Sequence, residues 1–254
     1  MSYLIAVTGK GGVGKTTFSA LLVNRLMENG CGPVLAVDAD PNSCLDQALG
    51  VKAEQTVGRA REEVRQESEE AAKNGISKQE LLNLKISQSL VEADGFDLIA
   101  MGRPEGSGCY CYANNVLKSV ISQIADEYPF VVLDNEAGLE NLSRRIVQKV
   151  DLLVLVSDAS NAGMQTLVRL HELAKEMEIS YDRLFLVINC LRGDSLPAKA
   201  EEVKKLTQAD QIIGLSYNEE IAEFAENNKS LLGISEGNSV TDKIDKIVKN
   251  HIKG

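Results

Sequence analysis

Gly9–Thr16 has the sequence Gly-Lys-Gly-Gly-Val-Gly-Lys-Thr and fits the pattern G-x-x-x-x-G-K-S/T. The apolar run Tyr3–Val7 precedes this stretch, and an amphipathic segment, Lys15–Asn29, follows it. A strand, a glycine-rich loop and a helix therefore stand in the order that a phosphate-binding loop requires. This stretch predicts the first strand, loop and helix of a parallel α/β sheet.

The residue types of the loop explain how it would hold a nucleotide. Glycines let successive backbone N–H groups turn toward phosphate oxygens, and the helix N-terminus adds partial positive charge. Lys15 would bridge the β- and γ-phosphates, Thr16 would ligate Mg²⁺ through its hydroxyl, and Thr17 would reach the α-phosphate. We therefore expect ATP and Mg²⁺ as ligands, with ATP hydrolysis as the reaction. The predicted nucleotide-binding residues of the loop are Gly9, Lys10, Gly11, Gly12, Val13, Gly14, Lys15, Thr16 and Thr17.

The rest of the chain alternates short apolar runs with helix-length amphipathic segments. The runs are continuous rather than alternating, as expected of strands buried on both faces. This rhythm predicts a doubly wound, mostly parallel sheet of about seven strands with helices on both faces. Beyond the first strand and helix, the expected strands are Val34–Val37, Asp97–Met101, Phe130–Leu133, Leu152–Val156, Leu184–Ile188 and Gln211–Gly214, and the expected helices are Ala113–Glu127, Glu140–Lys149, Met164–Met177 and Pro197–Leu206.

One segment, Val51–Glu92, breaks this rhythm with a dense mixed-charge run and few apolar residues. We interpret it as a solvated helical insertion between two strands, and a docking surface for a partner is the alternative. No linker, repeat or domain boundary is evident. We therefore expect residues 1–254 to form a single domain of the P-loop NTPase type.

Composition and charge limit the kinds of partner and the cellular compartment that we expect for this chain. The formal net charge of −10 argues against binding to nucleic acid or to an anionic membrane, because both need a clustered basic surface. No stretch approaches the roughly 18 apolar residues of a membrane helix, and the odd set of five cysteines is typical of reduced thiols. The cytoplasm is the expected compartment. Cys31, Cys44 and Cys190 are expected to be small buried side chains.

Two acidic segments follow predicted strands, where ligands bind at the carboxyl ends of parallel sheets. We call Asp38–Ser43 the switch I segment and Asp134–Gly138 the switch II segment. In switch II, Asp134 would hold Mg²⁺ through water, and Gly138 would offer its N–H to the γ-phosphate. Asp40 or Ser43 could instead cap a short helix that follows Pro41.

The loop contains a lysine in addition to Lys15, namely Lys10 near its start. A loop of this form resembles that of the deviant P-loop ATPases, which include septum-positioning and partition ATPases, the nitrogenase iron protein and metal-cofactor assembly ATPases. The resemblance implies a nucleotide-sandwich homodimer in which Lys10 reaches the phosphates of the other subunit. It also implies that Asp40 orients the attacking water, that Asp38 is an outer-sphere Mg²⁺ partner and that Asn189 reads adenine.

Two positions depart from relatives within this superfamily. Glu136 stands where the septum-positioning branch usually carries proline. Gly214–Asn218 lies where relatives often have Ile-Pro, and the missing proline weakens the match at the base pocket.

Cys109-Tyr110-Cys111 lies in a glycine-rich loop just before the helix expected from Ala113. Thiolates are preferred ligands of soft and borderline metals, and a helix N-terminus lowers thiol pKa. One chain supplies half of a tetrahedral set, and a twofold dimer with this pair on its axis would supply four sulfurs. An incidental pair of thiols is the alternative.

Together with the loop and the switch segments, the cysteine pair resembles the nickel-insertion ATPases of carbon monoxide dehydrogenase and acetyl-CoA synthase maturation. The resemblance implies Ni²⁺ at Cys109 and Cys111 and a nickel enzyme as the client. Zn²⁺ suits the same thiolates. The sequence does not choose between Ni²⁺ and Zn²⁺, nor between the two clients.

Two other functions stay open from the sequence. The first is an iron–sulfur carrier or electron-transfer ATPase resembling the nitrogenase iron protein, since four cysteines of a dimer also suit a 4Fe–4S cluster. The second is an ATPase that positions cargo on a membrane or chromosome, because the segment Val240–Ile252 carries an apolar stripe. Packing of that stripe against the sheet is the more common arrangement.

Overall fold

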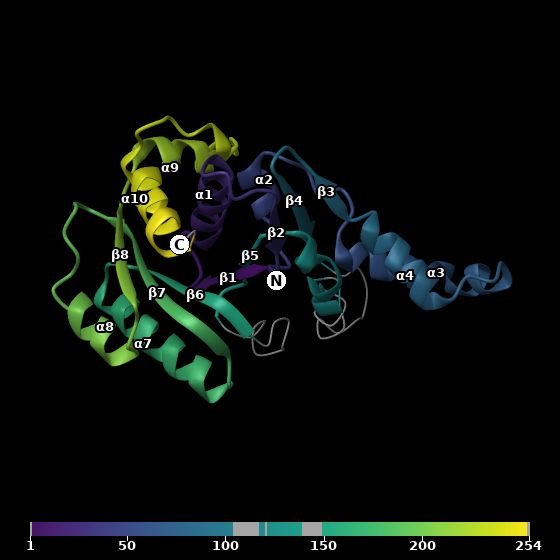
Figure 1. The fold of residues 1–254 in the computed structure, drawn as a ribbon, viewed down its shortest axis with the longest axis horizontal. Coiled ribbons are helices and arrows are strands. Elements are labelled where there is room, and N and C mark those ends of the chain that lie inside the picture. Colours follow the sequence, from purple (N-terminus) through teal and green to yellow (C-terminus); the bar gives the residue numbers. More distant parts are fainter. Residues whose placement is uncertain (1, 104–116, 120, 139–148, 253–254) are drawn as a thin grey trace.

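Eight strands form one sheet in the computed structural model, which describes residues 2–103, 117–119, 121–138 and 149–252 (Figure 1). The strand order is β3-β4-β2-β5-β1-β6-β7-β8, and every neighbouring pair is parallel except β3 with β4. The strands are β1 (Tyr3–Gly9), β2 (Val34–Asp38), β3 (Leu90–Glu92), β4 (Phe96–Ala100), β5 (Phe130–Asp134), β6 (Lys149–Asp158), β7 (Ser180–Leu191) and β8 (Gln211–Ser216).

The predicted fold class is confirmed, and each of the expected strands is present. The strand missing from the prediction is β3, which is three residues long and pairs antiparallel with β4. It forms the last three residues of the charged segment 51–92, and the turn to β4 is closed by the Ala93 N–H, which donates to the Phe96 carbonyl at 3.0 Å. A run this short carries too little periodicity to separate it from a loop.

Helices cover both faces of the sheet, which explains the continuous apolar runs of its strands. In β2, Val34 and Ala36 belong to one buried cluster, whereas Leu35 and Val37 belong to the other. The first cluster is completed by α1 (Lys15–Glu28), α2 (Leu45–Leu49), α9 (Glu219–Glu226) and α10 (Ser239–Ile247). The second is completed by α3 (Val57–Lys73), α4 (Lys78–Ser87), α7 (Asn161–Glu176) and α8 (Ala200–Thr207). Short helical turns are η1 (Ala125–Glu127), η2 (Leu231–Gly233) and η3 (Val248–Ile252).

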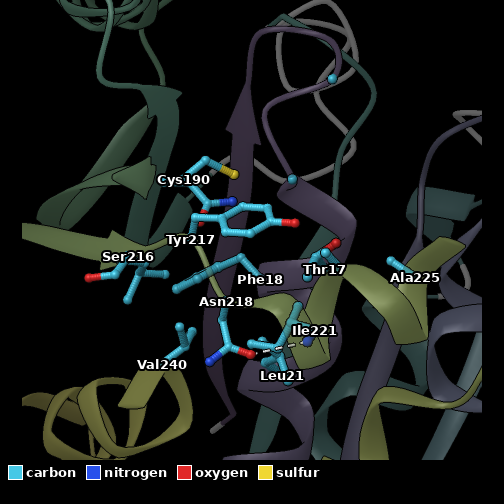
Figure 2. Close-up of a pocket in the computed structure, with 15 residues that line it drawn as sticks. Thr17, Phe18, Leu21, Cys190, Ser216, Tyr217, Asn218, Ile221, Ala225 and Val240 are labelled. Carbon is cyan, nitrogen blue, oxygen red and sulfur yellow. Dashed lines mark hydrogen bonds between the residues drawn. The ribbon is translucent and has the colours of Figure 1, made fainter. Parts of the chain in front are cut away.

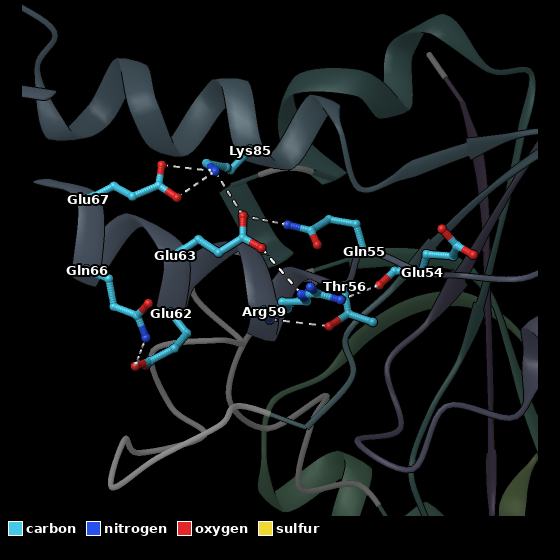
Figure 3. A network of polar contacts seen from close by, with 9 residues as sticks. All are labelled: Glu54, Gln55, Thr56, Arg59, Glu62, Glu63, Gln66, Glu67 and Lys85. Carbon is cyan, nitrogen blue, oxygen red and sulfur yellow. Dashed lines mark hydrogen bonds and ion pairs between the residues drawn. The ribbon is translucent and has the colours of Figure 1, made fainter.

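The charged segment 51–92 contains α3 and α4, which extend away from the sheet as a two-helix arm (Figure 1). Its helices are held together near their sheet-proximal ends by a polar network (Figure 3). In that network the ammonium of Lys85 on α4 lies 3.0 Å from a carboxylate oxygen of Glu63 and 3.0 Å from one of Glu67, both on α3. Thr56 caps α3, and Ser77 forms a capping box with Glu80 at the start of α4.

Several local expectations need correction or fall outside the described residues. Lys149, expected to end a helix, begins β6, and the rest of that predicted helix up to residue 148 is not described. Cys109 and Cys111 also lie outside the described residues. Cys44 and Cys190 are exposed, whereas Cys31 is buried as expected. Cys44 directly precedes α2, and Cys190 has a φ of 55° where the pairing of β7 with β8 shifts register. Both therefore lie where regular structure starts or is interrupted, outside the core.

The apolar stripe near the C-terminus is packed into the core. Val240, Ile244, Ile247 and Val248 are at most 5% exposed and share a cluster with α1. The stripe therefore stabilises the sheet face and offers no free apolar surface for lipid. None of the helices in the described part of the chain is long and apolar enough to cross a membrane.

We expect Ile244→Ala to lower the free energy of unfolding by about 2–5 kcal/mol, because it opens a cavity in a fully buried site. The matched control is Lys246→Ala on the exposed face of the same helix, which should change stability by about 0.5 kcal/mol or less. Urea unfolding followed by circular dichroism measures both. Equal stabilities of the two variants would contradict the packing of α10.

Candidate functional site

The glycine-rich loop lies between β1 and α1, and its glycines are required by the local backbone. Gly12 and Gly14 have φ values of 76° and 86°, in the left-handed region that disfavours other residues. A Cβ on Gly9 would lie 2.1 Å from the Val156 carbonyl oxygen of β6, and one on Gly14 would lie 2.4 Å from Asn189 Nδ2. The loop is thus held tightly against the ends of β6 and β7.

The two lysines of the loop have different environments. Lys15 is 8% exposed, and its ammonium donates a hydrogen bond to the Lys10 carbonyl at 3.2 Å. Burial lowers the pKa of Lys15, and the nearby carboxylates of Asp134, Asp40 and Glu136 oppose that shift. Lys10 is exposed at the outer part of the loop. Lys15 is therefore placed to meet a phosphate inside the loop, whereas Lys10 is available to a ligand or protein outside it.

Asp134, at the end of β5, ties the first turns of α1 to the sheet. Its carboxylate accepts hydrogen bonds from the hydroxyls of Thr16 at 2.7 Å and Ser19 at 2.9 Å. The side chain is buried, and burial raises its pKa to about 6. Ser19 was missed by the sequence reasoning, although it lies one helical turn after Thr16 and hence on the same face of α1.

Asp38, at the end of β2, lies beside Asp134 in the register of the sheet. Its two oxygens accept from the backbone N–H groups of Asp40 at 3.0 Å and Leu45 at 2.9 Å. The N-terminus of α2 is therefore satisfied by Asp38, and the alternative in which Asp40 or Ser43 caps this helix is not observed. Burial, followed by the charge of Asp134, raises the pKa of Asp38 to about 7.

The donor set around these residues fits Mg²⁺. The hydroxyl of Thr16 and the carboxylates of Asp38 and Asp134 are hard oxygen donors, which Mg²⁺ prefers. Two carboxylates buried side by side carry negative charge that a divalent cation would offset. Within the described ranges, no group of three or more His, Cys, Asp or Glu side chains is arranged for a metal. Magnesium at such a site is completed by nucleotide phosphates and water.

The switch II segment is hydrogen-bonded to the first strand and the loop. Asn135 donates to the Val7 carbonyl through its backbone N–H and its side-chain amide, each at 3.0 Å. Gly138 donates its N–H to the Gly9 carbonyl at 3.0 Å and accepts from the Thr8 hydroxyl. The contact predicted between the Gly138 N–H and a γ-phosphate therefore requires the bond to Gly9 to break.

A cavity of about 160 Å³ adjoins the loop (Figure 2). Asn189, at the end of β7, lines it and donates to the Val13 carbonyl at 2.9 Å. The other lining side chains are mostly apolar, and Tyr217 at the rim is 61% exposed. An adenine ring suits such a partly apolar cleft beside a phosphate loop. Lining residues beyond Asn189 and the loop include Phe18, Leu21, Tyr217, Ile221 and Val240.

The carboxyl ends of the strands therefore gather most of the predicted site residues. Lys15, Thr16, Asp38 and Asp134 lie around the end of β5 and the start of α1, and Asn189 joins the loop from the other side. Phe18, Ile221 and Val240 were not predicted, because they come from separate helices and show no shared pattern in the sequence.

Comparisons with known proteins agree with this geometry. A family model described as an AAA domain matches residues 2–185. An uncharacterized ATP-binding protein of Methanocaldococcus jannaschii is 43% identical over 98% of each chain. The carbon monoxide dehydrogenase accessory protein CooC of Rhodospirillum rubrum is 34% identical over 69% of this chain and 70% of its own. Among solved structures, a ParA family ATPase of Chlorobium tepidum superposes with a TM-score of 0.72 at 19% identity, over 98% of each chain, which supports the fold.

We expect Gly14→Ala to weaken nucleotide binding at least about tenfold, since a methyl group meets Asn189 and the positive φ strains alanine. Gly193→Ala is the matched control, because a Cβ there meets nothing within 4 Å. Titration with a fluorescent ATP analogue measures both affinities. Wild-type affinity of Gly14→Ala would show that the loop is not held against Asn189 as described.

Proposed function

We propose that this chain, which belongs to the AAA domain family of P-loop ATPases, is an ATP-dependent nickel metallochaperone. It inserts Ni²⁺ into carbon monoxide dehydrogenase or acetyl-CoA synthase. The observation that carries the proposal is the Cys109-x-Cys111 pair in a chain that is 34% identical to a carbon monoxide dehydrogenase accessory protein. The ATPase activity follows from the family, and the nickel cargo and the client are the proposal.

The described residues suggest how ATP hydrolysis proceeds. Backbone N–H groups of the loop and Lys15 hold the phosphates. Thr16, Asp38 and Asp134 would hold Mg²⁺, which would supply positive charge against the phosphate oxygens. Asp40 orients a water whose oxygen forms a bond to the γ-phosphorus as the bond to the bridging oxygen breaks. ADP leaves with that electron pair, and the water's proton passes to Asp40 or to phosphate.

Dimerisation supplies the remaining positive charge. Lys10 is exposed at the outer part of the loop, whereas Lys15 already occupies the inner position. We assign Lys10 to the phosphates bound by a second copy of the chain, where its charge stabilises the transition state. The site is then complete only in the homodimer, so hydrolysis and subunit contact are coupled.

The bond between Gly138 and Gly9 suggests how loss of phosphate is detected. With a γ-phosphate bound, the Gly138 N–H turns to the phosphate. After release of phosphate the N–H returns to the Gly9 carbonyl, the partner that it has in this structure. Switch II thus has two alternative acceptors, and the γ-phosphate decides between them.

Nickel is the cargo of this cycle. Two thiolates from each subunit give a dimer four soft ligands for one ion, and Zn²⁺ competes for them. The same sulfurs suit a 4Fe–4S cluster, the second candidate function. The positioning alternative loses the apolar stripe as a candidate membrane contact, because the stripe of α10 and η3 is buried.

We expect Lys10→Ala to reduce ATP turnover at least about a hundredfold while ATP still binds, because it removes one transition-state cation and leaves Lys15 in place. Lys15→Ala is the comparison variant and should lose ATP binding as well. Phosphate release assays and equilibrium binding separate the two effects. Normal turnover by Lys10→Ala would contradict the proposal that Lys10 acts on the phosphates bound by the other subunit.

For nickel, we expect the double variant Cys109→Ser/Cys111→Ser to lose binding of the single Ni²⁺ that the wild-type dimer holds. Cys44→Ser, which alters an exposed thiol elsewhere, is the matched control and should keep the metal. Metal analysis of anaerobically purified protein, with and without an ATP analogue, gives the stoichiometry. Iron and sulfide in place of nickel would favour the cluster-carrier function, and unchanged nickel binding by the double variant would refute the assignment.

A further inference from the structure

Arg103, which follows β4, contacts the switch I segment. Its guanidinium donates a hydrogen bond to Oδ1 of Asn42. Asn42 in turn donates to Oδ1 of Asp40 through its backbone N–H at 2.8 Å and through its side-chain Nδ2 at 3.0 Å. One side-chain amide therefore connects the arginine with the carboxylate that we assign to orienting water.

The chemistry of arginine fixes the orientation of the Asn42 side-chain amide. A guanidinium has donors and no acceptor, so the Asn42 amide must present its oxygen to Arg103. Its NH₂ group then faces Asp40, which uses Oδ1 for both hydrogen bonds from Asn42. In the described part of the chain, no hydrogen bond to Oδ2 of Asp40 is found, which leaves that oxygen for a water molecule.

The backbone next to Arg103 is anchored to the same segment. The Gly102 N–H donates to the Ser43 hydroxyl at 3.1 Å, and the Met101 N–H donates to the Asp38 carbonyl at 2.8 Å. Ser43 has a φ of 41°, and its hydroxyl also donates to the Asp40 carbonyl at 3.2 Å. Residues 101–103 thus follow switch I through three successive contacts, and Arg103 stays opposite Asn42.

We propose that Arg103 is a positioning residue for ATP hydrolysis, which acts through Asn42 to hold the Asp40 carboxylate toward the attacking water. The proposal rests on the role in hydrolysis that we assign to Asp40. Arg103 and Asn42 are both exposed, so their substitution should change stability little. Removing Arg103 frees the amide to rotate, and the carboxylate loses its fixed orientation at the reacting centre.

The test compares ATP turnover of Arg103→Ala, Asn42→Ala and the double variant at saturating Mg-ATP. Each single variant should lose about tenfold in kcat, with the KM for ATP within about twofold of wild type, because ATP itself is not contacted. The double variant should be no slower than the slower single variant, since Arg103 acts only through Asn42. Arg103→Lys should recover most of the rate, because one donor suffices for the bond to Asn42.

Arg65→Ala serves as the control, because Arg65 is an exposed arginine that pairs with Glu62 on the arm; its kcat should equal that of wild type. An unchanged kcat in Arg103→Ala, losses that multiply in the double variant, or a rise in KM that accounts for the effect would each overturn the inference.

Asp40→Asn separates the inference about Arg103 from the proposed role of Asp40. If it is inactive while Arg103→Ala is normal, only the inference fails. If it keeps full turnover, the role of Asp40 fails and the inference fails with it.

Discussion

The Asp134 carboxylate, enclosed between the first turns of α1 and the end of β2, is the interaction on which the site depends. A buried carboxylate is costly unless hydrogen bonds or a cation compensate it, and here the hydroxyls of Thr16 and Ser19 supply two bonds. These bonds fix α1 to β5. Because the phosphate loop leads into α1, its position follows from that fixation. The same carboxylate carries the charge that suits a cation, so one group serves both the fold and the ligand.

The two switch segments depend on the sheet in the same way. Each begins with an aspartate at the end of a strand, and β2 and β5 are neighbours, so Asp38 and Asp134 lie beside each other. Beyond these aspartates the chain leaves the sheet and is held by a few hydrogen bonds, such as Gly138 to Gly9 and Asn42 to Asp40. A rigid sheet with lightly held segments at its edge suits a nucleotide-dependent change, because few bonds need to be exchanged.

Much of this architecture could be predicted from the sequence. The central strands are predictable because burial on both faces requires continuous apolar runs. The loop is recognisable because its glycines meet backbone constraints that other residues cannot. What could not be predicted depends on contacts between distant segments. The cleft beside Asn189 is assembled from α1, β8, α9 and α10, and the capping of α2 by Asp38 reaches seven residues along the chain. Cys44 and Cys190 were placed wrongly because composition alone does not show where a strand or a turn ends.

The two edges of the sheet also bear on how copies of this protein can associate. An unpaired strand edge invites another chain to add a strand, and short edge strands or charged side chains at the edge discourage such growth. One edge here is β3, three residues long. At the other, the Lys243 ammonium donates to the Gly214 carbonyl of β8 at 3.0 Å. Neither edge is therefore a good template for continuing the sheet into a neighbouring molecule.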